Sequence, residues 1–92
     1  MQKRIECSVS GRVQMVMYRD FATRKARSLG LMGMVRNMPN GTVCVTAEGE
    51  EATLILFIEK LKKGSVLARV ESVAVVWCER TGEFTDFHIV YK

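Results

Sequence analysis

The sequence lacks a long apolar run, since its longest strictly apolar stretch extends only from Val73 to Cys78. A membrane-spanning helix needs roughly 20 such residues, so we expect no contact with a membrane interior. The first residues, Met1 to Glu6, contain no apolar core of a signal peptide. Because no export signal is expected, the sequence predicts a cytoplasmic protein with free thiols.

Metal ligands are also scarce. The chain has one histidine, His88, and three widely separated cysteines, Cys7, Cys44 and Cys78, which form no Cys-x-x-Cys pair. An odd number of cysteines cannot all pair within the chain, and structural metal sites need closely spaced ligands. We therefore expect no metal site and no cofactor.

Long tracts of one charge are absent. The 14 basic and 10 acidic residues give a formal net charge of +4 without a Lys/Arg tail. This balance favours a small anion over nucleic acid as a partner. With 92 residues, 48% of them hydrophobic and 26% charged, the composition is that of a globular protein. We expect one domain over residues 1–92.

The spacing of the apolar residues predicts the fold. Alternation predicts strands around Ile5–Val9, Leu31–Asn37, Val43–Ala47, Val70–Glu79 and Phe87–Tyr91. Helical spacing predicts helices from Tyr18 to Leu29 and from Glu50 to Lys63, and Met38–Gly41 is predicted to form a hairpin turn. The order βαββαβ with a short last strand predicts a ferredoxin-like α/β sandwich, in which an antiparallel sheet carries two helices on one face.

The segment from Gly11 to Arg19 joins the first strand to the first helix. A loop that ends at a helix start directs backbone N–H groups outward, and such a loop can bind an anion. Arg19 adds a planar, permanently charged donor that suits phosphate oxygens. An ordinary strand-to-helix connection with a surface arginine explains the same residues equally well on physical grounds alone.

A second segment, Gly33 to Asn37, ends beside the Pro39-containing turn. An amide held at the end of a strand can orient a water molecule. Asn37 could instead simply open the turn, which is a common use of asparagine.

Both segments resemble signatures of one enzyme family. Gly11-Arg12-Val13-Gln14 followed by Val16 and Tyr18-Arg19 is similar to the first signature of the acylphosphatases. Gly33-Met34-Val35-Arg36-Asn37, followed by Gly41-Thr42-Val43 and Gly49, is similar to the second. The resemblance extends over essentially the whole chain.

The resemblance implies a cytosolic hydrolase that cleaves the carboxyl–phosphate bond of small acyl phosphates without a metal, and that releases a carboxylate and inorganic phosphate. By the same resemblance, Arg19 binds the phosphate and Asn37 positions the attacking water. The phosphate-binding loop would comprise Gln14, Met15, Val16, Met17, Tyr18 and Arg19. Because a mixed anhydride is already activated, such an enzyme mainly needs to position the substrate and stabilise charge.

The chain departs from the family pattern at two positions. Met15 stands where the family loop has glycine, and Met34 stands where the second signature usually has an aromatic residue. The alternative function is therefore a non-catalytic anion-binding or regulatory module on the same fold, with its phosphate cradle altered by Met15.

Other residues carry weaker signals. His88 alternates out of phase with Phe87 and Ile89, and we interpret it as structural or solvated. Ala74, Val76 and Cys78 give the long strand a second apolar face, which we expect Cys44 to share. This open face would either mediate self-association or pack against the loop from Thr81 to Asp86.

Overall fold

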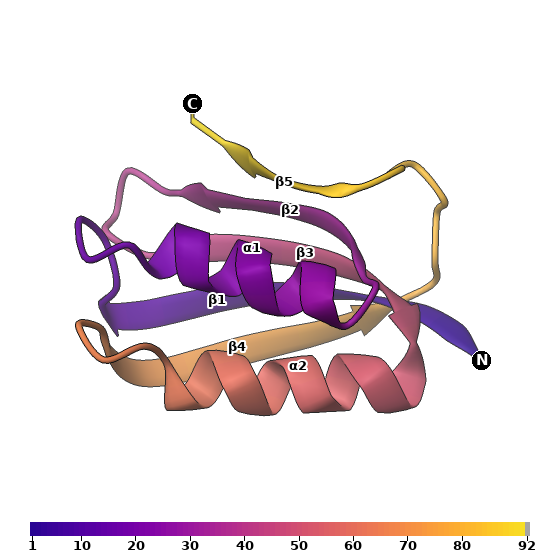
Figure 1. Ribbon diagram of the computed structural model, residues 1–92, viewed down its shortest axis with the longest axis horizontal. Helices are drawn as coiled ribbons and strands as arrows, with labels where there is room; N and C mark the ends of the chain where they lie inside the picture. Colours follow the sequence, from indigo (N-terminus) through magenta and orange to yellow (C-terminus); the bar gives the residue numbers. More distant parts are fainter. Residues whose placement is uncertain (92) are drawn as a thin grey trace.

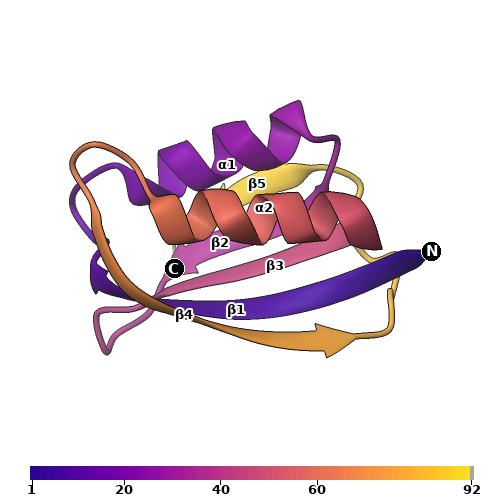
Figure 2. The same cartoon turned by 90° about the horizontal axis from the view of Figure 1, so that it is seen from below.

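The computed structural model describes residues 1–91 and contains one five-stranded sheet with two helices on one face (Figures 1 and 2). The elements are β1 (Gln2–Arg12), α1 (Tyr18–Ser28), β2 (Met32–Asn37), β3 (Val43–Glu50), α2 (Glu51–Lys63), β4 (Arg69–Cys78) and β5 (Phe87–Val90). The ferredoxin-like fold predicted from the sequence is confirmed. No helix of the described chain is long and apolar enough to cross a membrane.

The sheet has the strand order β4-β1-β3-β2-β5. The first four strands pair in antiparallel fashion, as predicted. The prediction of a wholly antiparallel sheet is wrong, because β5 pairs parallel to β2, with Val35 opposite Ile89. Apolar alternation specifies which face of a strand is buried, but it specifies neither the neighbouring strand nor its direction.

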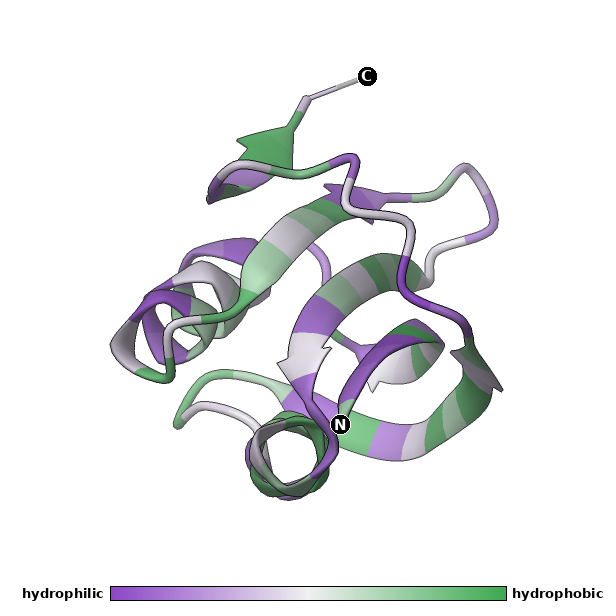
Figure 3. Cartoon of the chain, turned by 90° about the vertical axis from the view of Figure 1, so that its right-hand side faces the viewer, coloured by the Kyte–Doolittle hydropathy of each residue, from purple (hydrophilic) through white to green (hydrophobic). Residues whose placement is uncertain are grey.

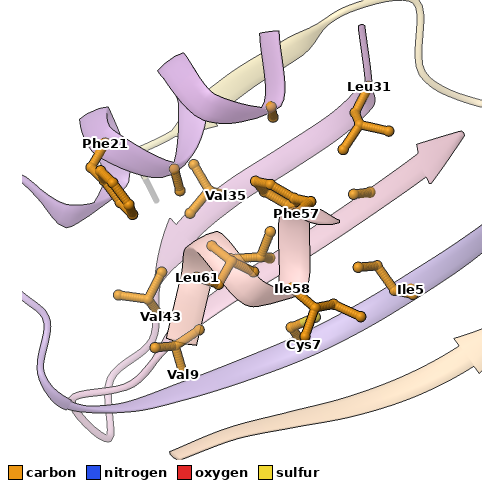
Figure 4. Close-up of a cluster of buried hydrophobic side chains, with 14 of the residues drawn as sticks. Ile5, Cys7, Val9, Phe21, Leu31, Val35, Val43, Phe57, Ile58 and Leu61 are labelled. Atoms are coloured by element: carbon orange, nitrogen blue, oxygen red, sulfur yellow. The ribbon is translucent and has the colours of Figure 1, made fainter. Parts of the chain in front are cut away.

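The core lies between the sheet and the two helices. In Figure 4, Phe57, Ile58 and Leu61 of α2 face the side chains of β1 and β3, and Phe21 of α1 lies above the sheet. Figure 3 shows the corresponding alternation of hydrophobic and hydrophilic residues along the strands. Buried side chains thus fix both helices on the sheet and thereby fix the loops at their ends.

The connecting loops gather at two opposite ends of the sheet. The loops β1–α1, β2–β3 and α2–β4 lie together at one end, on the left in Figures 1 and 2. The connection from β4 to β5 and the N-terminus lie at the other end. Both candidate segments from the sequence therefore reach the same end of the molecule.

The open face of the sheet is mixed rather than apolar. Val76 is 59% exposed, and Ala74 beside it is also exposed. The same face carries Glu48, which accepts hydrogen bonds from Thr81 and Gly82 of the β4–β5 connection. The connection therefore packs over one row of this face and leaves the row around Val76 uncovered.

Candidate active site

Two buried side chains hold the β1–α1 loop in place. Val13 and Tyr18 lie in the core on either side of the loop, and the Tyr18 hydroxyl donates a 2.8 Å hydrogen bond to the carbonyl of Leu61. Burial raises the pKa of Tyr18 above its ordinary value, so the phenol stays protonated. The side chain of Tyr18 is therefore an anchor of the loop, and only its backbone can face a ligand there.

The loop has an unusual backbone. Met15 and Met17 both adopt left-handed conformations, with φ angles of 62° and 61°. Met17 is the N-cap residue of α1, and no side chain caps the helix. The first N–H groups of a helix have no acceptor within it, and within residues 1–91 the N–H groups of Met15, Val16 and Met17 have no backbone acceptor. The loop therefore combines unused backbone donors with the positive end of a helix dipole, which together favour an anion.

The side chain of Met15 points away from the loop. It is 99% exposed, so it does not fill the space that an anion would occupy. The positive φ of Met15 nevertheless costs about 1–2 kcal/mol relative to a residue without a Cβ. The departure from the family glycine thus affects the backbone energy of the loop and leaves the cradle open.

Arg19 lies at the start of α1, beside the aromatic ring of Tyr91. Its guanidinium carbon lies 5.1 Å from the centre of the Tyr91 ring. No carboxylate or carbonyl of the described residues accepts a hydrogen bond from the guanidinium. Arg19 lines a hollow of about 540 Å³ together with Met15, Met17 and Tyr91. A half-buried cation with a free donor fork is suited to bind a phosphoryl group.

Gln14 connects the loop to the β2–β3 turn. Its side-chain amide nitrogen donates two hydrogen bonds of 2.9 Å, to the carbonyls of Met38 and Thr42. Gln14 is one of the residues predicted for the phosphate-binding loop, but its amide is directed to the turn. The contact joins the two segments that the sequence singled out.

Asn37 is the last residue of β2 and lies on the same face as the buried Val35. Its Oδ1 atom is buried and has no hydrogen-bond partner within the described chain. Asn37 lines a hollow of about 490 Å³ with Arg36, Met38 and Pro39. The turn is held by another residue, because Oδ1 of Asn40 accepts hydrogen bonds from the N–H and hydroxyl of Thr42. The interpretation that Asn37 merely opens the turn is thus not needed.

Arg19 and Asn37 come from different segments but reach the same end of the sheet. Gln14, five residues before Arg19, contacts Met38, which directly follows Asn37. On the other side, Tyr91 follows Val90, which pairs with Arg36, and Arg19 stacks on Tyr91. Arg19 and the unpartnered amide oxygen of Asn37 thus lie at the same end of the sheet, although the two residues line different hollows.

His88 lies outside this arrangement. It pairs with Met34 on the opposite face of the sheet, and its Nδ1 atom is 2.9 Å from Oδ1 of Asp86. A hollow of about 550 Å³ at the other end is lined by Lys3, Glu51, Trp77, Cys78 and Glu79. Although its volume is similar, its two carboxylates disfavour an anion. Across residues 1–91, no three His, Cys, Asp or Glu residues are grouped to hold a metal ion.

Sequence reasoning missed the left-handed conformation of Met17. Met17 precedes α1, and a methionine does not indicate a positive φ as a glycine, asparagine or aspartate would.

Comparison with known proteins identifies the family. The acylphosphatase family model matches residues 5–89. The chain belongs to the acylphosphatase family. It is 50% identical to an acylphosphatase of Thermus thermophilus, in an alignment that covers 94% of this chain and 97% of that protein. It is 44% identical to an acylphosphatase of Methylococcus capsulatus over 96% of each chain.

Solved structures agree with this assignment. The crystal structure of acylphosphatase from Bacillus subtilis superposes with a TM-score of 0.93 at 35% identity, and the match covers 99% of this chain and 100% of that one. The predicted family and enzyme class, a hydrolase of acyl phosphates, are thereby confirmed. The alternative of a non-catalytic module is not favoured by these relatives.

Proposed function

We propose that the loop from Gln14 to Arg19 binds the phosphoryl group of an acyl phosphate and that Asn37 positions the attacking water. Backbone N–H groups of Met15 to Arg19 donate to the phosphoryl oxygens. The Arg19 guanidinium supplies the charge-assisted hydrogen bonds. The side-chain amide of Asn37 holds the water in line with the bond that breaks.

One observation carries this proposal: within residues 1–91, the N–H groups of Met15, Val16 and Met17 and the guanidinium of Arg19 have no protein acceptor, and they belong to the loop and first turn at the uncapped start of α1. Backbone and guanidinium donors left free in a folded protein are costly unless they meet water or a ligand. The buried, unpartnered Oδ1 of Asn37 supports the assignment of the water.

The reaction requires little acid or base catalysis. The oxygen of water forms a new bond to phosphorus, and the bond between phosphorus and the carboxyl oxygen breaks. The electron pair leaves with the carboxylate, whose conjugate acid has a pKa of about 4, so the leaving group needs no proton. Water loses its proton to the solvent as inorganic phosphate forms. Positioning and stabilisation of the phosphoryl charge then supply the rate enhancement.

The test separates binding from chemistry. Asn37→Ala should lower kcat for acetyl phosphate by about 100-fold or more, the effect typical of one lost transition-state contact. Competitive inhibition by inorganic phosphate should change by less than about threefold, because Asn37 contacts the water and not the phosphate. The matched control is Asn40→Ala, which weakens the same turn but leaves Asn37 in place and should keep kcat near the parent value.

Three results would overturn these roles. If Asn37→Ala lost inhibition by phosphate but kept normal turnover, Asn37 would bind the phosphate and would not position the water. Equal loss of kcat in Asn40→Ala would assign the effect to the turn. No step is assigned to a metal ion, so activity that disappears in excess chelator and returns with added metal would also contradict the mechanism.

We further propose that residues 1–92 act as one acylphosphatase-like domain in the cytoplasm, with a small acyl phosphate as substrate and without nucleic acid or membrane as partner. The three cysteines are free thiols, which suits a reducing compartment. Self-association through the open face around Val76 is a further proposal. Sedimentation of the parent and of Val76→Lys tests it, and an unchanged monomer at all concentrations would refute it.

A further inference from the structure

Exposed apolar side chains gather around Arg19. Met15, Met17 and Tyr91 line the Arg19 hollow, and Val66 and Leu67, in the loop after α2, line a second hollow of about 220 Å³. These five make up half of the ten large apolar side chains that are exposed within residues 1–91. Such a concentration at one end of a small protein indicates a binding surface.

The two hollows adjoin. Met17 lines both of them. The β1–α1 loop and the α2–β4 loop, which carry the two groups of side chains, lie at the same end of the molecule in both views (Figures 1 and 2). Phe21 and Val16 also line the second hollow. An apolar surface therefore extends from Arg19 over Met17 to Leu67.

The exposed apolar side chains of the α2–β4 loop add little to the stability of the fold. Val66 is fully exposed and Leu67 is 63% exposed, so neither side chain contributes much to the core. Methionine has a flexible and polarisable side chain that adapts to varied apolar shapes. Met15 and Met17 stand where the phosphoryl group would meet the rest of its substrate.

The charges along this surface disfavour a second anion. Among the described residues that line the two hollows, the cations are Arg19 and Arg24. Arg24 is bonded through Nε to Oδ2 of Asp20 at 3.0 Å. Asp20 is itself one of the residues that line the Arg19 hollow. A substrate with a distal carboxylate or phosphate would meet a carboxylate there and would find no free cation beyond Arg19.

We infer that the acyl group of the substrate is apolar, an aliphatic chain or an aromatic ring that lies from Arg19 across Met17 toward Val66 and Leu67. This inference rests on the proposed placement of the phosphoryl group at Arg19. It assigns Val66 and Leu67, outside the phosphate-binding loop, the role of determining specificity.

The experiment compares kcat/KM for acetyl, butanoyl, hexanoyl and succinyl phosphate. Each buried methylene raises affinity by up to about fourfold, so hexanoyl phosphate should exceed acetyl phosphate by at least about tenfold. The gain should appear in KM, because the acyl chain is bound equally in the ground and transition states. Succinyl phosphate, which adds a distal carboxylate to a four-carbon chain, should fall about tenfold or more below butanoyl phosphate.

The double variant Val66→Ser/Leu67→Ser tests the surface itself. It should reduce the preference for hexanoyl over acetyl phosphate to about threefold or less and leave acetyl phosphate hydrolysis unchanged. The matched control is Ile55→Ser/Leu56→Ser, which replaces two exposed apolar side chains of α2 that line neither hollow. It should retain the full preference. All four positions are exposed, so both double variants should fold.

Each failure has a distinct signature. If the parent hydrolyses no acyl phosphate of any chain length, the proposed function fails. If it hydrolyses all four at the same kcat/KM, or if the preference survives in Val66→Ser/Leu67→Ser, the inference about the acyl group is overturned. Loss of binding to phosphatidylserine vesicles in that double variant, with the chain-length preference intact, would assign the surface to a membrane and would equally refute the inference.

Discussion

The two ends of the sheet each hold an arginine against an aromatic ring, but the two arginines are used differently. Arg4 lies 5.5 Å from the Phe84 ring centre, and Arg19 lies 5.1 Å from that of Tyr91. Arg4 donates hydrogen bonds to the side chains of Glu6, Glu48, Thr81 and Glu83. Within residues 1–91, the Arg19 guanidinium donates none.

The same contrast holds for the groups around each arginine. At the Arg4 end, Glu48 is only 2% exposed, yet it accepts hydrogen bonds from Thr81, Gly82 and Arg4. At the Arg19 end, the N–H groups of Met15, Val16 and Met17 and Oδ1 of Asn37 have no partner in the part of the chain that the structure describes. A charged group whose hydrogen bonds are satisfied stabilises the fold, whereas one with unused donors is available to a ligand.

The largest expected effect is on catalysis. Arg19→Lys keeps the charge but loses the planar donor fork, and charge-assisted hydrogen bonds to phosphate contribute about 1.5–3 kcal/mol. We therefore expect kcat/KM for acetyl phosphate to fall by about 10- to 150-fold, while the free energy of unfolding changes by less than about 0.5 kcal/mol. Enzyme kinetics and urea unfolding on the same preparation check both. A stability loss as large as the catalytic loss would show that Arg19 is structural, like Arg4.

The converse change at the other end should affect stability alone. Glu48→Gln removes a buried charge that pairs with Arg4, and breaking such a pair costs about 3 kcal/mol. Urea unfolding measures this loss, and kcat/KM of the folded variant should stay near the parent value. A large drop in kcat/KM at temperatures where the variant is folded would contradict the claim that the Arg4 end contributes only to stability.

Glu48 also predicts a pH dependence of stability. Burial by itself raises the pKa of Glu48, but hydrogen bonds from the N–H and hydroxyl of Thr81, the N–H of Gly82 and Arg4 outweigh it and lower the pKa below its ordinary value. The stabilisation is therefore complete above the unfolded-state pKa of about 4.3 and is lost as the pH falls through the lower pKa of the folded state. Urea unfolding at a series of pH values from 6 to 2 should show a steeper decline for the parent than for Glu48→Gln. If the free energy of unfolding declined equally with pH in the parent and in Glu48→Gln, the lowered pKa would not belong to Glu48.

A smaller effect is expected for the contact between Gln14 and the β2–β3 turn, which joins the two segments of the candidate site. Gln14→Leu removes the side-chain hydrogen bonds to the carbonyls of Met38 and Thr42, each of which still accepts a backbone N–H. The loss should cost about 0.5–1.5 kcal/mol of stability per hydrogen bond. Because the loop is then less firmly held against the turn, kcat/KM should fall about tenfold. Steady-state kinetics measure kcat/KM of the variant, and urea unfolding measures its stability. Full activity in Gln14→Leu would show that the tie is dispensable for catalysis.

The smallest effect concerns the strained loop residues. Met15→Gly relieves about 1–2 kcal/mol of strain at φ 62° but adds about 0.5–1 kcal/mol of unfolded-state entropy, so stability should rise by up to about 1.5 kcal/mol. A less strained loop should also bind inorganic phosphate more tightly and raise turnover by a few fold. Thermal unfolding and phosphate inhibition measure these changes. Weaker phosphate binding in Met15→Gly would mean that the methionine side chain supports the loop.

The contrast between the two arginines could not be predicted from the sequence. Alternation and helical spacing predicted all five strands and both helices, because these depend on neighbours along the chain. The partners of Arg4 include Glu48, Thr81 and Glu83, which are 44 to 79 residues away. The parallel pairing of β5 and the conformation of Met17 likewise depend on tertiary contacts. The resemblance to acylphosphatases correctly indicated the family, and the structure adds that Gln14 faces the turn and Tyr18 the core.

The most direct test is an NMR titration of the parent and of Arg19→Lys with inorganic phosphate, followed through the backbone amide signals. In the parent, the amides from Met15 to Asp20 should shift and saturate, because these donors are unused in the free protein. In Arg19→Lys, the same signals should shift only at far higher phosphate concentrations. Saturable shifts around Lys3 and Trp77 instead, or identical titrations in both proteins, would contradict the assignment of phosphate binding to this loop.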